Sequence, residues 1–291
     1  MGVRRSVSGS LASLSLGMLA CAGPNLWTDG TSVSTGAASH GRLRSPAKLA
    51  RKGEGYVVPP RWSERGFQYG VRELVDTIVR AAQRVREQHR KSMLGVADLS
   101  AHIGGRSSWH VSHQSGRDVD LLFYTTDGRG RPLAPPEHDM FRFDGSGRPY
   151  HRERDPSYVD AAWQQRRFDA ARNWQLVEEL LSDPTIRVQW IFVANSLQDN
   201  LLRFARAHDR PYWLVEYAAT VMREPAGPPH DDHMHIRIYC PRADRFHGCL
   251  DTGPIWQHEK KSFKYAGPER YDPVLWRLMT SMSMLAHGMR G

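Results

Sequence analysis

Five of the fourteen histidines lie in two short segments that also carry aspartates. In the first segment a histidine is followed seven residues later by an aspartate, and the second segment contains a His-x-His pair. Imidazole and carboxylate groups are the ligands that catalytic zinc uses, usually three protein groups with a fourth position left to water. The two segments together therefore predict a metal site. The residues concerned are His110, His113 and Asp120 in the first segment, and His230, His233 and His235 in the second.

An alternating pattern predicts that the second segment continues as a β-strand. If residues 233–239 form a strand, successive side chains point to opposite faces. The apolar face can then lie against a core while the polar face lines a cleft. The polar face would carry His233, His235 and Arg237, and the apolar face Met234, Ile236 and Ile238.

The first segment can turn toward the same site. Asp118 and Asp120 share a face by the same alternation, with Val119 turned away. Gly116 allows the backbone between His113 and Asp120 to turn tightly, so that both residues can reach one ion.

Each part of this pattern also has an ordinary explanation. His110 and His113 could be surface residues. Asp118 and Asp120 could be solvated at a strand end, and many His-x-His pairs bind nothing. The conjunction of a His-x6-Asp motif with a His-x-His motif on an apolar strand favours the metal site over coincidence.

Apolar periodicity predicts helices, and β-branched content predicts strands. Along the chain these helices and strands do not alternate regularly. Such an order is typical of an α+β domain, here with a central, mostly antiparallel sheet flanked by helices. The predicted helices are residues 71–86 and 158–181, the second ended by Asp183 and Pro184; the predicted strands are residues 119–124, 188–193 and 233–239; the longest Gly- and Pro-rich loops are residues 127–136 and 144–150.

The N-terminal residues have the pattern of an export signal. Two arginines precede a modestly apolar stretch, residues 7–20, which is too short for a transmembrane helix and is followed by Cys21. Residues 18–21, Met-Leu-Ala-Cys, also resemble a lipobox, the signal for lipid attachment to the cysteine. We predict that residues 1–21 are a signal peptide and that Cys21 is a candidate for a lipid anchor.

The remaining chain divides by composition. Residues 22–54 are rich in Gly, Ser, Thr and Ala, which predicts a flexible linker. Apolar character returns near Tyr56, so the folded domain that carries the metal site is predicted over residues 55–270. Residues 271–291 read as a Met-rich amphipathic helix that packs on its own domain.

Charge and composition say less about function. Hydrophobic residues make up 40% of the chain and the formal net charge is +9. The basic residues are spread along the chain without a recognisable nucleic-acid motif, which disfavours a nucleic-acid-binding protein. A basic surface equally suits a polyanionic partner such as a cell wall rich in carboxylates.

Two cysteines follow Cys21, namely Cys240 and Cys249, with eight residues between them. In an exported protein such a pair favours a disulfide that closes a small loop. Two free thiols in a cytosolic protein are the alternative, which the export signal disfavours.

The two histidine segments and their surroundings resemble the penicillin-insensitive murein endopeptidases. This family belongs to a wider group of zinc peptidases that includes D-Ala-D-Ala dipeptidases and the fold of the hedgehog signalling domain, and the resemblance implies that fold here. The likeness covers roughly residues 56–250, and its two motifs are specific when they occur together. It rests on Gly104 and Gly105, the run from His113 to Asp120, and the run from His230 through His233 and His235 to Cys240 and Pro241. It also takes in Asp98-Leu99-Ser100 and the segment from Trp174 to Val193.

The resemblance also implies roles for individual residues. It makes His113, Asp120 and His235 the zinc ligands and His233 the general base. His110 and His230 become further active-site histidines, and His110 is in addition a candidate metal ligand.

These roles imply a hydrolytic mechanism. Zinc would lower the pKa of its bound water toward about 7 and polarise the scissile carbonyl. His233 would take the proton of that water, and His230 or His110 could donate a hydrogen bond to the developing oxyanion. Asp118 or Asp232 could orient an imidazole through a hydrogen bond to the ring nitrogen that faces away from the metal.

The substrate implied by the resemblance is the D-alanyl–diaminopimelyl cross-link between peptidoglycan stem peptides in a Gram-negative periplasm. Arg117 and Arg237 could receive stem-peptide carboxylates, or they could be structural partners of nearby acids. Two other functions stay open: a D,D-carboxypeptidase or dipeptidase that trims stem ends, and a non-catalytic, zinc-containing wall-binding module. The oligomeric state is not predicted.

Overall fold

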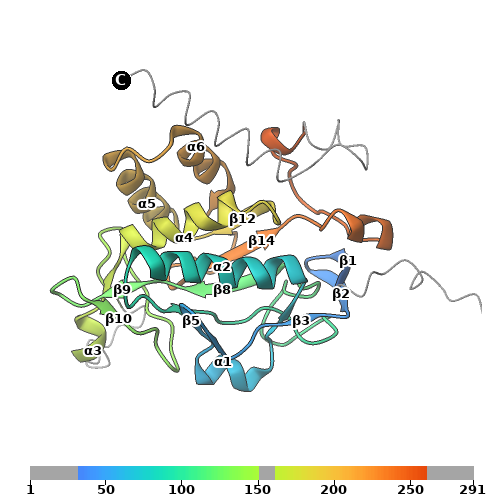
Figure 1. Ribbon diagram of the computed structural model, residues 1–291, viewed down its shortest axis with the longest axis horizontal. Coiled ribbons are helices and arrows are strands. Elements are labelled where there is room, and N and C mark those ends of the chain that lie inside the picture. Colours follow the sequence, from blue (N-terminus) through green and yellow to red (C-terminus); the bar gives the residue numbers. More distant parts are fainter. Residues whose placement is uncertain (1–31, 151–160, 261–291) are drawn as a thin grey trace, which may run out of the picture.

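The computed structural model describes residues 32–150 and 161–260 (Figure 1). The candidate site lies on a four-stranded sheet in which two of the three strand pairings are antiparallel and one is parallel. The strands, in spatial order, are β13 (Met222–Arg223), β12 (Val188–Phe192), β14 (His233–Ile238) and β8 (Asp118–Leu122).

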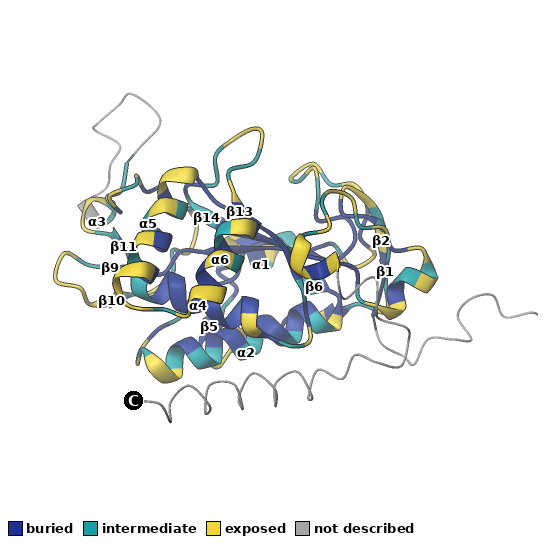
Figure 2. Cartoon of the chain, turned by 90° about the horizontal axis from the view of Figure 1, so that it is seen from above, coloured by how far each residue is buried: buried dark blue, intermediate teal, exposed yellow. Residues whose placement is uncertain are grey.

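Helices supply much of the core on the apolar side of this sheet. Helix α2 (Arg72–Gln88) packs on α4 (Ala170–Ser182), which in turn packs on α5 (Asn195–Ala207) and α6 (Tyr212–Val221). Helix α2 buries one face and exposes the other (Figure 2), as its apolar period predicts. Met234 and Ile236 of β14 are fully buried in the same core.

Several sequence predictions agree with these elements. The helix predicted over residues 71–86 and the strands predicted over residues 119–124, 188–193 and 233–239 are confirmed to within two residues at each end. The architecture is a mixture of helices and small sheets, and the hedgehog-like fold stays a prediction. No helix in the described ranges is both long and apolar enough to cross a bilayer.

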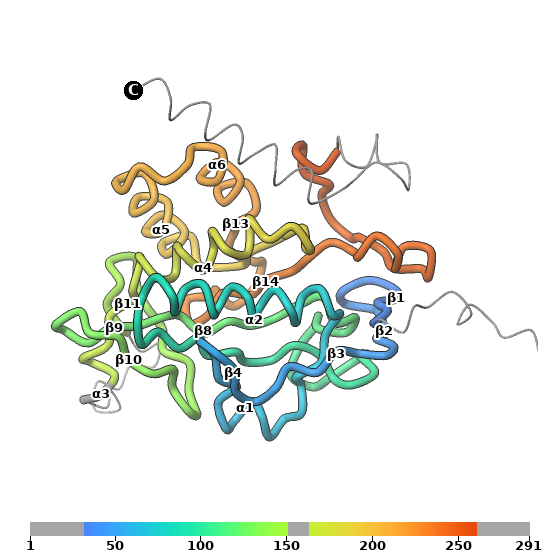
Figure 3. The backbone as a smooth tube through the Cα atoms, viewed as in Figure 1, coloured from blue at the N-terminus to red at the C-terminus, as the bar shows by residue number. Residues whose placement is uncertain are grey.

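The linker predicted over residues 22–54 is wrong from residue 32 onward. Strands β1 (Val33–Ala37) and β2 (His40–Arg44) form an antiparallel hairpin, and Leu43 and Leu49 are buried in the core. The hairpin lies beside the segment around Cys249, where Gly36 donates a backbone hydrogen bond to Gly248 at 2.9 Å (Figure 3). Long-range pairing therefore orders a segment whose own composition is too polar to predict a strand. The folded domain accordingly begins well before the predicted residue 55.

The second predicted helix, residues 158–181, is also corrected. Its described part splits into α3 (Ala161–Gln164), strand β11 (Arg167–Phe168) and α4. Asp169 caps α4 by accepting a hydrogen bond from the backbone N–H of Arg172 at 3.0 Å, and this starts a new helix. The end of α4 at Ser182, just before Asp183 and Pro184, is as predicted.

Short elements complete the described chain, while the predicted signal peptide, the candidate anchor Cys21 and the predicted C-terminal helix over residues 271–291 lie outside the described residues. The short elements are β3 (Ala47–Lys48), β4 (Lys52–Gly53), β5 (Tyr56–Val57), α1 (Pro60–Arg65), β6 (Tyr69–Gly70), β7 (Leu94–Gly95), β9 (Thr125–Thr126), β10 (Pro132–Leu133) and a 3₁₀ helix (Ala243–His247).

Candidate active site

Strands β8 and β14 bring the two predicted segments together. Their antiparallel register places Asp120 opposite His235 and Asp118 opposite Arg237. Because paired residues project from the same side of a sheet, these four side chains share one face, as the alternation predicts. His233 is opposite Leu122 and extends the same row.

The loop before β8 places His113 against this row. His113 has a left-handed backbone with φ of 63°, which is costly for a residue other than glycine. The surrounding contacts hold it there: the Ser100 hydroxyl donates to the His113 carbonyl, and the His113 N–H donates to Asp118 Oδ2 at 3.3 Å. Gly116 has φ of 74°, so the tight turn predicted at this glycine is present.

Three donor atoms of the cluster form a nearly equilateral triangle. His113 Nε2 lies 3.3 Å from Asp120 Oδ1 and 3.3 Å from His235 Nδ1, and the third side, from His235 Nδ1 to Asp120 Oδ1, is 3.1 Å. Tetrahedral zinc with bonds of about 2.0–2.1 Å separates its ligand atoms by roughly 3.3–3.4 Å. Asp120 Oδ1 is buried and accepts no hydrogen bond of normal geometry. The donor set thus fits a tetrahedral ion, and the buried oxygen needs a partner.

All the imidazoles of the cluster except that of His230 are oriented through the outer nitrogen, which leaves the inner nitrogen facing Asp120. This arrangement confirms that Asp118 and Asp232 orient imidazoles. The outer contacts are His113 Nδ1 to the Leu99 carbonyl at 2.5 Å, His235 Nε2 to Asp118 Oδ1 at 2.9 Å, His233 Nδ1 to Asp232 Oδ1 at 2.6 Å, and His110 Nε2 to Asp98 Oδ2 at 2.8 Å.

Asp98 is a site residue to which the sequence assigned no role. It is 1% exposed, and its Oδ2 accepts hydrogen bonds from both His110 and Arg65, the latter at 2.7 Å. The available signal was an aspartate within an apolar run, Val96 to Leu99. A buried acid in such a run needs a charged or hydrogen-bonding partner.

His110 and His230 lie at opposite sides of the cluster. The inner nitrogen of His110 is 3.9 Å from Asp120 Oδ2, and the His230 ring centroid is 4.6 Å from that of His233. Two separate groups could each hold a metal ion, one of His110, His113 and Asp120, the other of His230, His233 and His235. Burial, followed by the nearby His233 and His235, lowers the pKa of His230 to about 4, so this ring is neutral at pH 7.

The carboxylates of Asp118 and Asp120 are ionised despite their burial. Burial alone would raise the pKa of Asp118, yet Arg237 and His235 hold it well below the usual range. The pKa of Asp120 is likewise lowered against burial by His113 and His233. Burial would lower the pKa of His233, but Asp120 and Asp232 raise it to about 10 in the metal-free site. The cluster therefore offers ionised carboxylates to a cation, which would compete with the proton on His233.

The two predicted substrate-binding arginines have different surroundings. Arg117 is 1% exposed and donates to the Leu250 carbonyl at 3.0 Å and to Asp251 at 3.2 Å, contacts that favour the second of the two predicted alternatives, a structural partner of a nearby acid. Its position is structural because the segment after Cys249 covers it. Arg237 lies in the site row, where its Nε donates to Asp118 at 2.6 Å and its guanidinium is 5.5 Å from the Phe192 ring.

The predicted disulfide between Cys240 and Cys249 is present. Its loop contains Asp244, which accepts a hydrogen bond from the Ser34 backbone N–H at 2.7 Å. Asp251, two residues after Cys249, accepts hydrogen bonds from both Arg117 and the Cys240 backbone N–H. The disulfide loop therefore ties the N-terminal hairpin to the segment that leads into β8.

Comparison with known proteins agrees with this geometry. The family model of the penicillin-insensitive murein endopeptidases matches residues 34–260. The penicillin-insensitive murein endopeptidase of Klebsiella pneumoniae is 27% identical over 229 residues, covering 77% of this chain and 72% of the relative. That of Haemophilus influenzae is 27% identical over 78% of this chain and 70% of the relative, and that of Escherichia coli O9:H4 is 26% identical over 73% and 68%. The chain belongs to the penicillin-insensitive murein endopeptidase family.

Proposed function

We propose that this protein is an exported, zinc-dependent endopeptidase that hydrolyses the D-alanyl–diaminopimelyl cross-links of peptidoglycan. The observation that carries the proposal is the triangle of donor atoms from His113, Asp120 and His235, with sides of 3.1–3.3 Å around a buried carboxylate oxygen that lacks a hydrogen bond. These three residues would hold the zinc ion.

Zinc, when bound, supplies Lewis acidity toward the scissile carbonyl and lowers the pKa of water. His233 is assigned as the general base because its Nε2 is 3.4 Å from Asp120 Oδ1, on the inner side of the cluster. It accepts a proton from the attacking water and returns it to the leaving amine. Asp232, bonded to His233 Nδ1 at 2.6 Å, holds the ring and stabilises its protonated form.

His230 and His110 flank the site as hydrogen-bond donors. A neutral imidazole carries one N–H, and His230 Nδ1 lies 3.3 Å from the Pro228 carbonyl. In the tautomer with the proton on Nε2, the ring can donate a hydrogen bond to the developing oxyanion without carrying charge. His110 is held by Asp98 and faces Asp120 through its other nitrogen, so it serves either the oxyanion or a metal.

Arg237 is proposed to bind a carboxylate of the stem peptide. Only its Nε has a hydrogen-bond acceptor among the described residues, and its side chain is 16% exposed. The terminal nitrogens of the guanidinium can therefore form the paired hydrogen bonds that a carboxylate accepts. The substrate places the enzyme in the periplasm, with Cys21 as the candidate lipid anchor.

Digestion of purified cross-linked muropeptides by the mature protein, followed by mass spectrometry, tests this function. We expect dimers to become monomers, with activity lost on chelation and restored by zinc. Linear pentapeptides are the companion substrate, since cleavage of these alone would identify a D,D-carboxypeptidase. Intact dimers and intact pentapeptides with zinc bound would leave a non-catalytic wall-binding module.

A further inference from the structure

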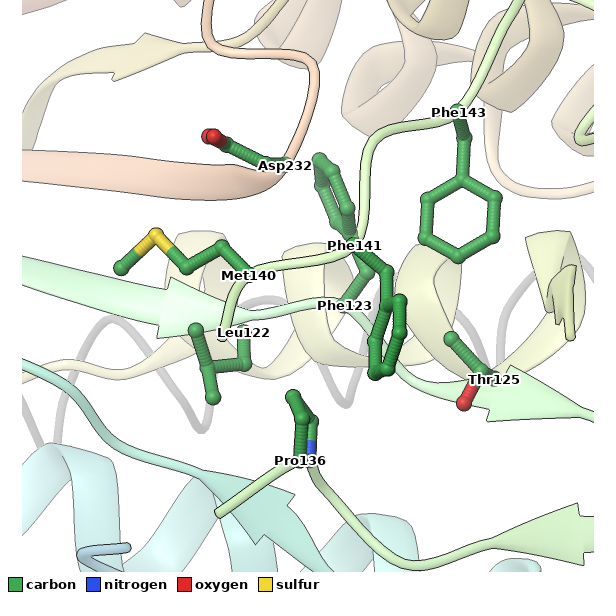
Figure 4. Close-up of a pocket in the computed structure, with 8 residues that line it drawn as sticks. All are labelled: Leu122, Phe123, Thr125, Pro136, Met140, Phe141, Phe143 and Asp232. Carbon is green, nitrogen blue, oxygen red and sulfur yellow. The ribbon is translucent and has the colours of Figure 1, made fainter. Parts of the chain in front are cut away.

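A small apolar pocket adjoins the His233 end of the site row. Figure 4 shows its side chains grouped around one space, with Asp232 at the edge. Leu122, the last residue of β8, and the following Phe123 contribute buried walls, and the half-buried Met140 and Phe141 close the outer side. Asp232 is the one charged residue of the lining.

The register of the sheet fixes the position of this pocket relative to the site. Leu122 follows Asp120 by two residues on the same face of β8, about 7 Å along the strand, and it is opposite His233. Asp232, which orients His233, is itself a wall of the pocket. A group bound in the pocket would therefore lie one side chain away from the reacting atoms.

The chemistry of the pocket selects a small apolar group. Its volume of about 10 Å³ is close to the roughly 10–15 Å³ that a single water-sized group needs. The Asp232 carboxylate already accepts from His233 and from Arg142 at 3.4 Å, so it is committed to partners within the protein. Thr125 also lines the pocket, and its hydroxyl accepts a hydrogen bond from Arg166 at 2.8 Å. The remaining side chains of the lining offer carbon and sulfur atoms, so a methyl group fits better than a polar or long side chain.

We propose that this pocket binds the side-chain methyl of the residue that supplies the scissile carbonyl. The inference rests on the proposed function, in which that residue is D-alanine. Covalent geometry places such a methyl about 2.5 Å from the carbonyl carbon. The pocket thus determines specificity by accepting one methyl and rejecting larger side chains, and Met140 is the wall that sets its size.

The test uses zinc-loaded protein and cross-linked stem-peptide dimers that carry glycine, D-alanine or D-valine at this position. In the unaltered enzyme kcat/KM should be about fourfold lower for glycine than for D-alanine, as expected for one buried methyl. For D-valine it should be at least tenfold lower because the larger side chain overfills the pocket. Met140→Ala should raise kcat/KM for D-valine at least tenfold relative to D-alanine.

Met140→Leu is the matched control, because it conserves volume and should keep the original substrate order. Zinc content and melting temperature of each variant check that the site and the fold are intact, and the substrate series on the unaltered enzyme tests the pocket without any variant. Equal kcat/KM for all three substrates, or an unchanged order in folded Met140→Ala, would overturn the pocket assignment alone. Failure of the zinc-loaded enzyme to cleave even the D-alanine dimer would overturn the proposed function and the pocket with it.

Discussion

One oxygen of Asp118 accepts hydrogen bonds from two residues of the neighbouring strand: His235 Nε2 at 2.9 Å and Arg237 Nε at 2.6 Å. The other oxygen accepts from the His113 backbone N–H at 3.3 Å. A single fully buried carboxylate therefore positions two of the three proposed zinc ligands and the arginine proposed to bind substrate.

Replacing this carboxylate should weaken both the fold and the metal site. Asp118→Ala leaves the Arg237 charge without its partner, which should cost about 3–5 kcal/mol of unfolding free energy. Loss of an orienting partner should also weaken zinc binding by about 10–100-fold. Urea unfolding and zinc titration measure the two effects. Asp118→Asn, which keeps an acceptor oxygen, should lose less unfolding free energy and less zinc affinity than Asp118→Ala. Equal stability and equal zinc affinity in the native protein and both variants would refute the assigned role.

His233 and His235 form a pair of substitutions that separates catalysis from metal binding. His235→Ala should abolish stoichiometric zinc binding because it removes a proposed ligand. His233→Ala should keep the zinc and lower kcat by about 10²–10⁴-fold, the usual contribution of a general base. Metal analysis and muropeptide kinetics on both variants provide the check. Near-normal activity of zinc-loaded His233→Ala would show that another group is the base.

The disulfide should contribute measurably to stability. In the chain-entropy model, closing a loop of about ten residues stabilises the fold by roughly 2.5–3 kcal/mol. Cys240→Ser with Cys249→Ser should lower the free energy of unfolding by about this amount, measured in urea without reductant. Adding reductant should destabilise the native protein but not the double variant. A native protein insensitive to reductant, with free thiols demonstrated, would contradict the prediction.

Asp244 should make stability fall as pH rises. Burial raises the pKa of this carboxyl to about 7, although the Ser34 backbone N–H lowers it, against about 3.9 in the unfolded chain. Between these values the folded state holds a proton that the unfolded state has released. The resulting stability is fully present below pH 3.9 and is lost as pH rises through 7, by up to about 4 kcal/mol.

Asp244→Asn isolates this effect because asparagine can still accept from Ser34 but does not titrate. The variant should be more stable than the native protein at pH 8, and the difference should shrink toward pH 4. Urea unfolding at several pH values gives the comparison, in which titrations shared by both proteins cancel. A difference that does not vary with pH would rule out the raised pKa.

Local patterns predicted the parts of the fold that depend on local interactions. The apolar period of α2 and the alternation of β14 are visible in sequence because each element buries its own face. Hairpin β1–β2 is not visible, since it is stabilised by contacts such as Ser34 with Asp244, 210 residues away. A composition rich in Gly and Ser concealed a hairpin whose stabilising contacts, such as that of Gly36 with Gly248, lie at the other end of the chain.

The candidate site shows the same division. The histidines and Asp120 follow from short motifs with ligand chemistry, and the alternation of residues placed Asp120, His233 and His235 on one face. Asp98 has no such motif, and its role depends on where Arg65 and His110 meet. The burial of Arg117 was not predictable because the covering carbonyl, Leu250, lies 133 residues away.

The early start of β1 limits how far the enzyme could reach. If Cys21 carries the lipid, only residues 22–32 separate the anchor from the folded domain, because the hairpin begins at Val33. Eleven fully extended residues span at most about 40 Å, whereas a connecting segment over residues 22–54 could span about 120 Å. An anchored enzyme would then work only in a narrow shell above the membrane. Cross-links in more distant wall material could be cleaved only by molecules released from the anchor.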